Sequence, residues 1–225
     1  MGNTVGSSIR VNNYWQKKWI QIKLSLVLTE EQKSVLIGSL LGDGTLRLGE
    51  GAINVNFKVE HGLAQKDYVF WKYNIFQPWV FTEPKISYRY KESRERYAKS
   101  WWFRTVRHPI LTDFRKRFYE NGKKIIPFDI VKDLNNLAMA VWVMDDGCLS
   151  RNTLDISTYS FTLPEVELLI EALKSKFDLR ARYHRDRDKG YRMYLSINET
   201  KKLVDIIKPY MVPVMNYKVA LDRTP

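Results

Sequence analysis

The chain has 225 residues, which is enough for one large domain or two small ones that each bury an apolar core. Its formal net charge is +12, from 37 Lys and Arg against 25 Asp and Glu, so a polyanionic partner is favoured electrostatically. The single cysteine, Cys148, excludes an intrachain disulfide, and the longest apolar run, residues 137–144, is too short to span a bilayer. No signal peptide is recognised in the sequence. We therefore expect a soluble intracellular protein without a membrane partner, in an organelle matrix or in a bacterial or archaeal cytoplasm.

Residues 1–25 mix tryptophan and isoleucine with lysine, which is typical of a short amphipathic extension or of a basic arm. The segment LIGSLLGDG follows at residues 36–44 and has an echo, MAVWVMDDG, at residues 139–147. Asp43 and Asp146 are 103 positions apart, and the glycines that follow them have the same separation. This spacing favours an internal repeat over two unrelated core helices that each end in an Asp-Gly turn.

Both segments predict helices, and Thr29 with Gln32 forms a capping-box pattern before the first. A final glycine suits the left-handed position that ends a helix, so we expect Asp43 and Asp146 at the two C-termini. The helix dipole disfavours a carboxylate there by up to about 1 kcal/mol, so cations are expected nearby.

Gly38 and Gly42 are four residues apart and share one helix face, which allows a second helix to approach closely. The second repeat is the expected partner. Two carboxylates brought together in this way raise each other's pKa unless a cation intervenes. Their oxygens, with nearby backbone carbonyls, are ligands that suit a hard divalent ion such as Mg²⁺.

Strands are predicted after the first repeat at residues 52–60, 85–91 and 100–107, with helices at 64–76 and 109–119. The helix 109–119 is expected to be closed by Asn121-Gly122. In each strand, apolar residues alternate with polar or basic ones. The polar sets are Asn54, Asn56, Lys58 and Glu60, then Lys85, Ser87, Arg89 and Lys91, then Arg104 and Arg107. Side chains of these types can read base edges or contact phosphate.

The second half repeats this order, with strands at residues 154–160, 179–185 and 191–198 and helices at 164–177 and 199–211. Its polar strand faces carry Asp155, Ser157 and Tyr159, then Arg180, Arg182 and His184, then Arg192, Tyr194, Ser196 and Asn198. The three histidines of the chain are widely separated and lack metal-ligand spacing, which disfavours a histidine-dependent nuclease.

The predicted fold class is α+β, with two αββαββα subdomains related by a pseudo-twofold axis. We expect an N-terminal extension over residues 1–25, a first subdomain over 26–127 and a second over 128–225. Antiparallel sheets with one basic face would form a saddle for DNA. An ordinary α+β sheet with one solvated face remains the alternative, although the recurrence of Arg, Lys and Asn favours DNA.

With both Asp-Gly repeats and the alternating strands, residues 28–218 resemble the LAGLIDADG homing endonucleases of the single-chain, two-motif type. The resemblance implies that Asp43 and Asp146 bind metal, together with the carbonyls of Gly42 and Asp145. It places basic residues near the scissile phosphates at Lys124 and Lys218, with Lys123 as the alternative to Lys124. Some positions depart from the family pattern. Val141 replaces the helix glycine of the second motif, where Trp142 adds bulk, and Leu41 stands at a variable position of the first motif where an acid can occur. Tyr159 stands where a residue such as Gln is expected.

The function implied is a site-specific DNA endonuclease that uses Mg²⁺, for which Mn²⁺ or Ca²⁺ can substitute in binding. A monomer would make a double-strand break with short 3′ overhangs in a partly asymmetric target of about 20 bp, since each half would span about one helical turn. The alternatives are a non-cleaving nucleic-acid-binding protein, such as an intron RNA-splicing maturase, and a basic protein without a nucleic-acid role. The candidate DNA-binding residues are Arg47, Asn54, Asn56, Lys58, Lys85, Ser87, Arg89, Arg104, Arg107, Arg151, Ser157, Tyr159, Arg180, Arg182, His184, Arg192, Tyr194 and Ser196.

Overall fold

The computed structural model describes residue 21, residues 25–91 and residues 96–221, with the side chains of Lys91 and Arg96 left out. The predicted N-terminal extension therefore lies almost entirely outside the described residues. In the described ranges no helix has the length and apolar character needed to cross a membrane.

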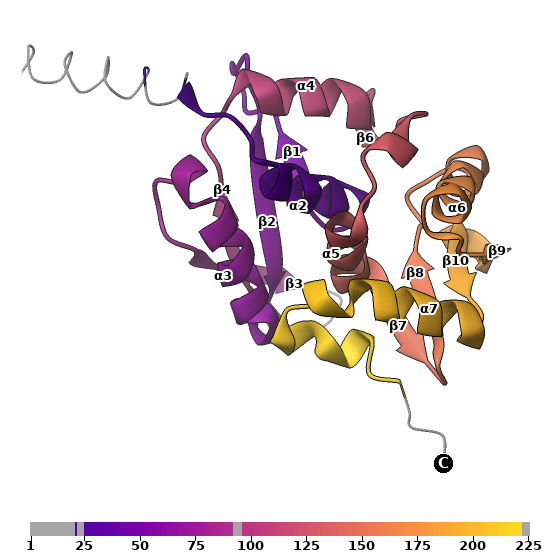
Figure 1. Ribbon diagram of the computed structural model, residues 1–225. Helices are drawn as coiled ribbons and strands as arrows, with labels where there is room; N and C mark the ends of the chain where they lie inside the picture. The colour runs from indigo at the N-terminus through magenta and orange to yellow at the C-terminus, as the bar shows by residue number, and fades with distance from the viewer. Residues whose placement is uncertain (1–20, 22–24, 92–95, 222–225) are drawn as a thin grey trace, which may run out of the picture.

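The first half follows the predicted order of elements (Figure 1). Its helices are α2 (Glu30–Leu41), α3 (Lys66–Ile75) and α4 (Pro109–Phe118). Its strands are β1 (Thr45–Arg47), β2 (Asn56–Gly62), β3 (Lys85–Lys91) and β4 (Arg96–Arg104), which pair antiparallel in the order β1-β2-β4-β3. The capping box of Thr29 and Gln32 opens α2 as predicted.

The second half has the same order of elements and the same sheet topology. Its helices are α5 (Asn136–Asp146), α6 (Leu163–Phe177) and α7 (Ile197–Ile207). Its strands are β7 (Gly147–Ser150), β8 (Thr153–Ser157), β9 (Ala181–Arg185) and β10 (Tyr191–Leu195), in the order β7-β8-β10-β9. The α+β class and the repeated αββαββα order are thus confirmed, and β1 and β7 are the short strands that the hydrophobic pattern did not reveal.

Helices α2 and α5 pack side by side at the centre, between the two sheets (Figure 1). A Cβ atom on Gly38 would lie 2.3 Å from the carbonyl oxygen of Ala138 and 2.7 Å from the Cβ of Val141. The close approach predicted for this face is therefore present. The bulk of Val141, which departs from the family pattern, fits because the residue opposite has no side chain.

Gly38→Ala is expected to lower the free energy of unfolding by about 1–3 kcal/mol, because neither a backbone carbonyl nor a packed valine can give way without shifting the helices. Urea unfolding of the full chain measures the change. Gly62→Ala is the matched control, since no atom lies within 4 Å of its added Cβ and its φ is −59°. Equal stability of the two variants would show that the helix contact tolerates a methyl group.

One face of each sheet is apolar and covered by helices. Leu46, Phe57, Val59 and Phe103 are buried in the first sheet, and Leu154, Ile156, Met193 and Leu195 are buried in the second. Burial of these faces stabilises the fold because apolar area is removed from water. The opposite faces carry the polar residues of the alternating pattern.

Several predicted strand limits are wrong because backbone groups outside the ladders find other partners. The strand expected from residue 52 begins at Asn56, since the Val55 carbonyl accepts from the His108 N–H. Ile53 is consequently 89% exposed. The strand expected to reach residue 107 ends at Arg104. The strand expected to reach residue 198 ends at Leu195, because Ser196 is the N-cap of α7.

The apolar side predicted for β3 is exposed rather than buried. Ile86, Tyr88 and Tyr90 are 38%, 60% and 55% exposed. The reason is that β3 is an edge strand, while α3 packs against β2 and β4.

The left-handed glycine predicted to end each motif helix is also wrong, since neither Gly44 nor Gly147 has a positive φ. Both are sites of close approach instead, where a Cβ would lie 2.7 Å from the Ser39 Cβ or 2.6 Å from the Val143 carbonyl oxygen. Asn121 and Gly122, with φ of 48° and 80°, form a hairpin turn between β5 (Tyr119–Glu120) and β6 (Lys123–Lys124). They therefore do not simply close the preceding helix.

Candidate functional site

The two motif helices carry their acids to one place. Asp146 is the last residue of α5, and Asp43 lies two residues after the end of α2. Burial, and next the charges of Asp43 and Asp145, raise the pKa of Asp146 to about 7. Burial and the Asp145 charge raise the pKa of Asp43 as well. The negative charge of Asp43 therefore acts on the carboxylate of Asp146.

Two lysines supply the positive charge expected at these helix ends. Lys124 donates to the carbonyl oxygen of Gly42, and Lys218 donates to the carbonyl oxygen of Asp145 at 2.8 Å. Gly42 and Asp145 are equivalent positions of the two motifs, so the lysines occupy pseudo-symmetric places. Burial lowers the pKa of both ammonium groups, although the three aspartates oppose this. Lys123 is exposed, and it is Lys124 that reaches the site.

The local fold explains how each lysine arrives. The hairpin of β5 and β6 turns the chain back after α4, and Lys124 is the last residue of β6. Lys218 is the last residue of a 3₁₀ segment, Pro213–Lys218, that follows α7. Lys218 is buried, and its contact with the end of α5 joins the C-terminal region to the site.

Asp145 is at the centre of a buried polar network. The Nζ of Lys72 lies 2.9 Å from Oδ1 and 3.2 Å from Oδ2 of Asp145, and both side chains are 0% exposed. The hydroxyl of Tyr68 donates to Oδ1 at 2.7 Å, and the backbone N–H of Asp43 donates to Oδ2 at 3.1 Å. Burial alone would raise the pKa of Asp145, but Lys72, with His61 and these hydrogen bonds, holds it below its ordinary value.

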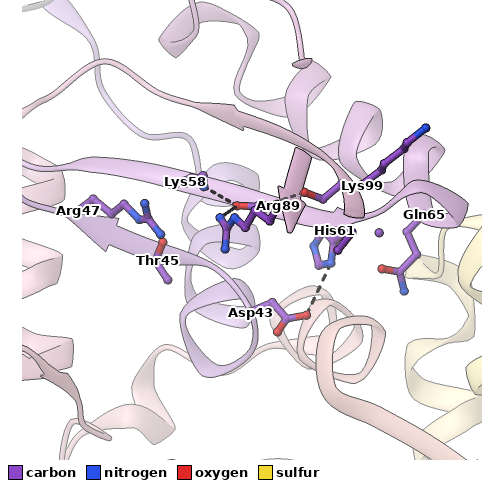
Figure 2. Close-up of a pocket in the computed structure, with 12 residues that line it drawn as sticks. Asp43, Thr45, Arg47, Lys58, His61, Gln65, Arg89 and Lys99 are labelled. Atoms are coloured by element: carbon purple, nitrogen blue, oxygen red, sulfur yellow. Dashed lines mark hydrogen bonds and ion pairs between the residues drawn. The ribbon is translucent and has the colours of Figure 1, made fainter. Parts of the chain in front are cut away.

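His61, on β2, lies between the carboxylates of Asp43 and Asp145. Its Nδ1 is 3.6 Å from Oδ2 of Asp43 (Figure 2). Its Nε2 is 3.7 Å from Oδ1 of Asp145. Burial, followed by the Lys72 charge, lowers the pKa of His61 to about 4, so the imidazole is neutral. Its Nε2 lies 3.5 Å from Lys72 Nζ, which can only donate, and this favours the tautomer with the proton on Nδ1, facing Asp43.

Sequence reasoning missed Lys72, Tyr68 and His61 as members of this site. The available signal was on α3, where Tyr68, Val69 and Lys72 are the buried residues of the helix. Lys72 is four residues from Tyr68 and therefore lies on the same apolar face of the helix. A lysine on a buried face indicates that a buried acid pairs with it. For His61, the predicted strand ends at Glu60, whereas β2 continues to Gly62 and so includes His61.

Most of the candidate DNA-binding residues of the first half share the polar face of its sheet. The strand register puts Arg47 beside Asn56, Lys58 beside Arg104, and Ser87 beside Ser100. Lys85 and Arg89 belong to the same face. A cavity of about 430 Å³ joins this face to the acidic centre, and its lining includes Asp43, Arg47, Lys58, His61 and Arg89 (Figure 2). Asn56, predicted on the exposed polar face, is buried, with only 6% of its surface exposed.

The second sheet has a corresponding polar face, on which Ser157 neighbours Arg192, and Arg192 neighbours His184. Tyr194 and Arg182 are neighbours on the same face. Arg192 forms an ion pair of 3.2 Å with Asp155, which reduces the free positive charge of this face.

Six of the candidates lie outside the strands to which they were assigned or in connecting segments. Asn54 accepts a hydrogen bond from Thr112, and the hydroxyl of Tyr159 donates to Asp186 at 2.8 Å. Arg151 has a φ of 47° in the turn between β7 and β8. Arg180 precedes β9 and Ser196 is a helix N-cap, while Arg107 lies in the segment after β4 and lines a second cavity with Asn56 and Arg104. In these connecting segments the direction of a side chain depends on the turn or the helix cap to which it belongs. The two-residue alternation of a strand therefore does not predict it.

The acidic centre offers oxygen ligands of the kind that a hard divalent cation takes. In the described residues no group of three or more His, Cys, Asp or Glu side chains is arranged to hold a metal. Two carboxylates that repel one another, Asp43 and Asp146, nevertheless lie beside the carbonyls of Gly42 and Asp145. Each carbonyl oxygen has two lone pairs and uses one for a lysine. A cation bound there would complete its shell with phosphate or water oxygens, as Mg²⁺ commonly does.

The chain is similar in sequence to known DNA endonucleases over most of its length. Residues 33–203 match the LAGLIDADG DNA endonuclease family. The chain is 30% identical over 209 residues to the DNA endonuclease I-ChuI of Chlamydomonas applanata, covering 86% of this chain and 96% of that protein. It is also 30% identical over 202 residues to the cytochrome b mRNA maturase bI2 of Debaryomyces hansenii, covering 88% and 77%.

A solved structure, that of the homing endonuclease I-WcaI bound to its DNA recognition sequence, matches the fold with a TM-score of 0.83. The alignment covers 98% of this chain and 96% of that one, at 23% identity. Both motifs, both sheets and the family match over most of the length lead to one conclusion. The chain belongs to the LAGLIDADG DNA endonuclease family, and it carries two motifs in a single chain.

Proposed function

We propose that this protein is a site-specific, divalent-metal-dependent DNA endonuclease. The observation that carries the proposal is the meeting of two acidic helix ends with two pseudo-symmetric lysines. Two polar sheet faces extend from this centre, and the first of them joins it through the cavity at Asp43. The net charge of +12 favours binding of a nucleic acid. The first subdomain would cover residues 26–127 and the second residues 128–225.

Asp43 and Asp146 would hold the cation, with the carbonyl oxygens of Gly42 and Asp145. When bound, Mg²⁺ supplies Lewis-acid stabilisation of phosphate charge and lowers the pKa of a coordinated water. Two lysines of the chain act directly on the phosphate and the leaving group. Lys124 and Lys218 offset the negative charge that develops on the phosphate, or donate a proton to the leaving oxygen. Burial lowers the pKa of both ammonium groups, which assists that donation.

The pseudo-twofold repeat gives each DNA strand one half of the centre, so that a monomer cleaves both strands. Two sheets that each follow about one turn of DNA, roughly 10 bp, imply a target of about 20 bp. Because the two polar faces differ in sequence, the target is only partly symmetric. Short 3′ overhangs are the expected product ends.

Incubation with Mg²⁺ and a randomised DNA library, followed by sequencing of the cut ends, tests the proposal. We expect one enriched target and a fixed offset between the cuts in the two strands. Cut ends without sequence preference, or the absence of cutting by the wild-type protein, would contradict a site-specific endonuclease.

An RNA-splicing maturase activity is the second candidate, because one relative of 30% identity is named a cytochrome b mRNA maturase. The same library experiment separates the two functions when it is run beside a splicing assay on an intron-containing RNA. Asp43→Asn would stop DNA cleavage, while a maturase activity that needs only RNA binding would persist.

Lys124→Met and Lys218→Met are each expected to slow cleavage by about 100-fold, which is the usual cost of removing one electrostatic donor from a reacting centre. Single-turnover cleavage of the selected target measures the rate, and DNA affinity should change little because the lysines lie at the centre of a long interface. Lys123→Met is the control, since it removes an exposed lysine one residue from Lys124. If that variant were slowed as much as Lys124→Met, the contact with Gly42 would not be the decisive one.

A further inference from the structure

A buried ion pair that joins the two halves of the site has no role in the proposed cleavage mechanism. Lys72 and Asp145 are both 0% exposed in their side chains and lie 2.9 Å apart. Such a pair is weak support for stability, because well-packed apolar residues of similar volume often stabilise a fold as well or better. The pair lies next to the acidic centre, and both of its members contact groups that surround Asp43.

One connection runs from the ion pair to the backbone of Asp43. Helix α2 ends at Leu41, and Oδ2 of Asp145 is the side-chain acceptor for the Asp43 N–H. Gly42 makes this possible, because a Cβ there would lie 2.4 Å from the Cβ of Asp145. The Asp145 carboxylate thus continues α2 by one hydrogen bond and fixes the start of the segment that carries Asp43.

A second connection runs through His61 to the side chain of Asp43. Lys72 Nζ lies 3.5 Å from Nε2 of His61, and Nδ1 of His61 lies 3.6 Å from Oδ2 of Asp43. Tyr68 supports both connections, since its hydroxyl donates to Asp145 and its ring packs against that of His61 with centroids 5.0 Å apart. Lys72 is therefore linked to Asp43 by two routes, one to the backbone and one to the carboxylate.

The equivalent acid of the second motif has no such support. Asp146 lies within α5, so its N–H needs no side-chain acceptor, and its carboxylate has no hydrogen bond or ion pair with any residue in the described ranges. The two halves of the pseudo-symmetric centre therefore differ in how firmly their acids are held.

We propose that Lys72, Tyr68, His61 and Asp145 are positioning residues for Asp43, and that they tune the half of the centre that Asp43 serves more than the other half. This inference rests on the proposed function, in which Asp43 is a metal ligand. Partners behind a metal ligand orient it, and their removal typically costs about 10- to 100-fold in metal affinity or activity. Here that cost falls more on the DNA strand cleaved by the half of the centre that contains Asp43.

The test compares Tyr68→Phe with Tyr73→Phe in the full chain, on the target selected from the DNA library. Both variants remove one hydroxyl from α3, but Tyr73 is outside the network. Each DNA strand is end-labelled separately, so that the two cleavage rates are measured in one reaction with Mg²⁺. Calorimetric titration of Ca²⁺ into the protein–DNA complex provides a readout of metal binding that does not depend on cleavage.

We expect Tyr68→Phe to change the ratio of the two strand rates by about tenfold and to weaken Ca²⁺ binding by a similar factor. Tyr73→Phe should match the wild type in both measurements. A general loss of folded protein would slow both strands equally and leave their ratio unchanged. His61→Phe, which keeps a flat ring, should shift the ratio in the same direction and decides the matter if Tyr68→Phe does not fold.

The inference is overturned if the folded variants and Tyr73→Phe give the same strand ratio and the same Ca²⁺ affinity. Failure of the proposed function gives a different result, because the wild-type protein would then select no target from the library.

Discussion

Asp43→Asn or Asp146→Asn is expected to reduce double-strand cleavage by at least about 1,000-fold, which corresponds to about 4 kcal/mol of transition-state stabilisation. Each substitution removes one carboxylate from the proposed metal site, and the asparagine oxygen that replaces it is neutral. Plasmid cleavage with Mg²⁺ measures the loss. Unchanged cutting by either variant would refute the assignment of that acid.

DNA affinity of these variants should stay within about tenfold of the wild type, or about 1.4 kcal/mol, because the interface depends on the sheet faces. The same substitutions should raise the melting temperature of the metal-free protein. The pKa of both acids is raised in the folded chain, which means that their charged forms cost free energy there. A neutral amide removes that repulsion, so loss of cleavage without loss of stability would identify a functional rather than a structural pair.

Lys72→Met is expected to lower the free energy of unfolding by about 3–5 kcal/mol, because it leaves the Asp145 charge buried without its partner. Combining it with Asp145→Asn should restore much of the loss, since the double variant has no unpaired charge. Urea unfolding of the two single variants and the double variant forms a thermodynamic cycle. Lys116→Met, at a lysine side chain that is 73% exposed on α4, should change stability by less than about 0.5 kcal/mol. If Lys72→Met were as stable as the wild type, the buried pair would not organise this region.

The alternation of apolar and polar residues predicts the limits of some strands correctly and of others wrongly. Lys85–Lys91 was predicted with its limits intact, because seven residues alternate without interruption. The strand predicted at residues 191–198 extends too far, since Ser196 and Asn198 continue the alternation although Ser196 is the N-cap of α7. A polar residue that caps a helix and one that faces solvent from a strand look alike in one sequence. The hydrogen bond from the Thr200 N–H to the Ser196 carbonyl separates them.

The catalytic candidates also divide into residues that the sequence indicates and residues that only tertiary packing brings to the site. Asp43 and Asp146 were found because each ends a repeated motif, and Lys124 and Lys218 were proposed from the family resemblance. Lys72 and Tyr68 belong to no motif, and they come next to Asp145 only when α3 packs on the central helices. A contact such as that between Lys72 and Asp145, which are 73 residues apart, leaves no local pattern.

The sequence by itself determined that this protein has two copies of one αββαββα unit, that each copy carries an acid at or just after the end of its first helix, and that its net charge is positive. Periodicity, capping and net charge are local or additive properties, so they can be read along the chain. Only the tertiary structure decided which groups surround those acids and how unequally the two are supported. Burial, the pKa of a carboxylate and the tautomer of His61 depend on neighbours brought from distant segments, and their free energies arise only when the core excludes water.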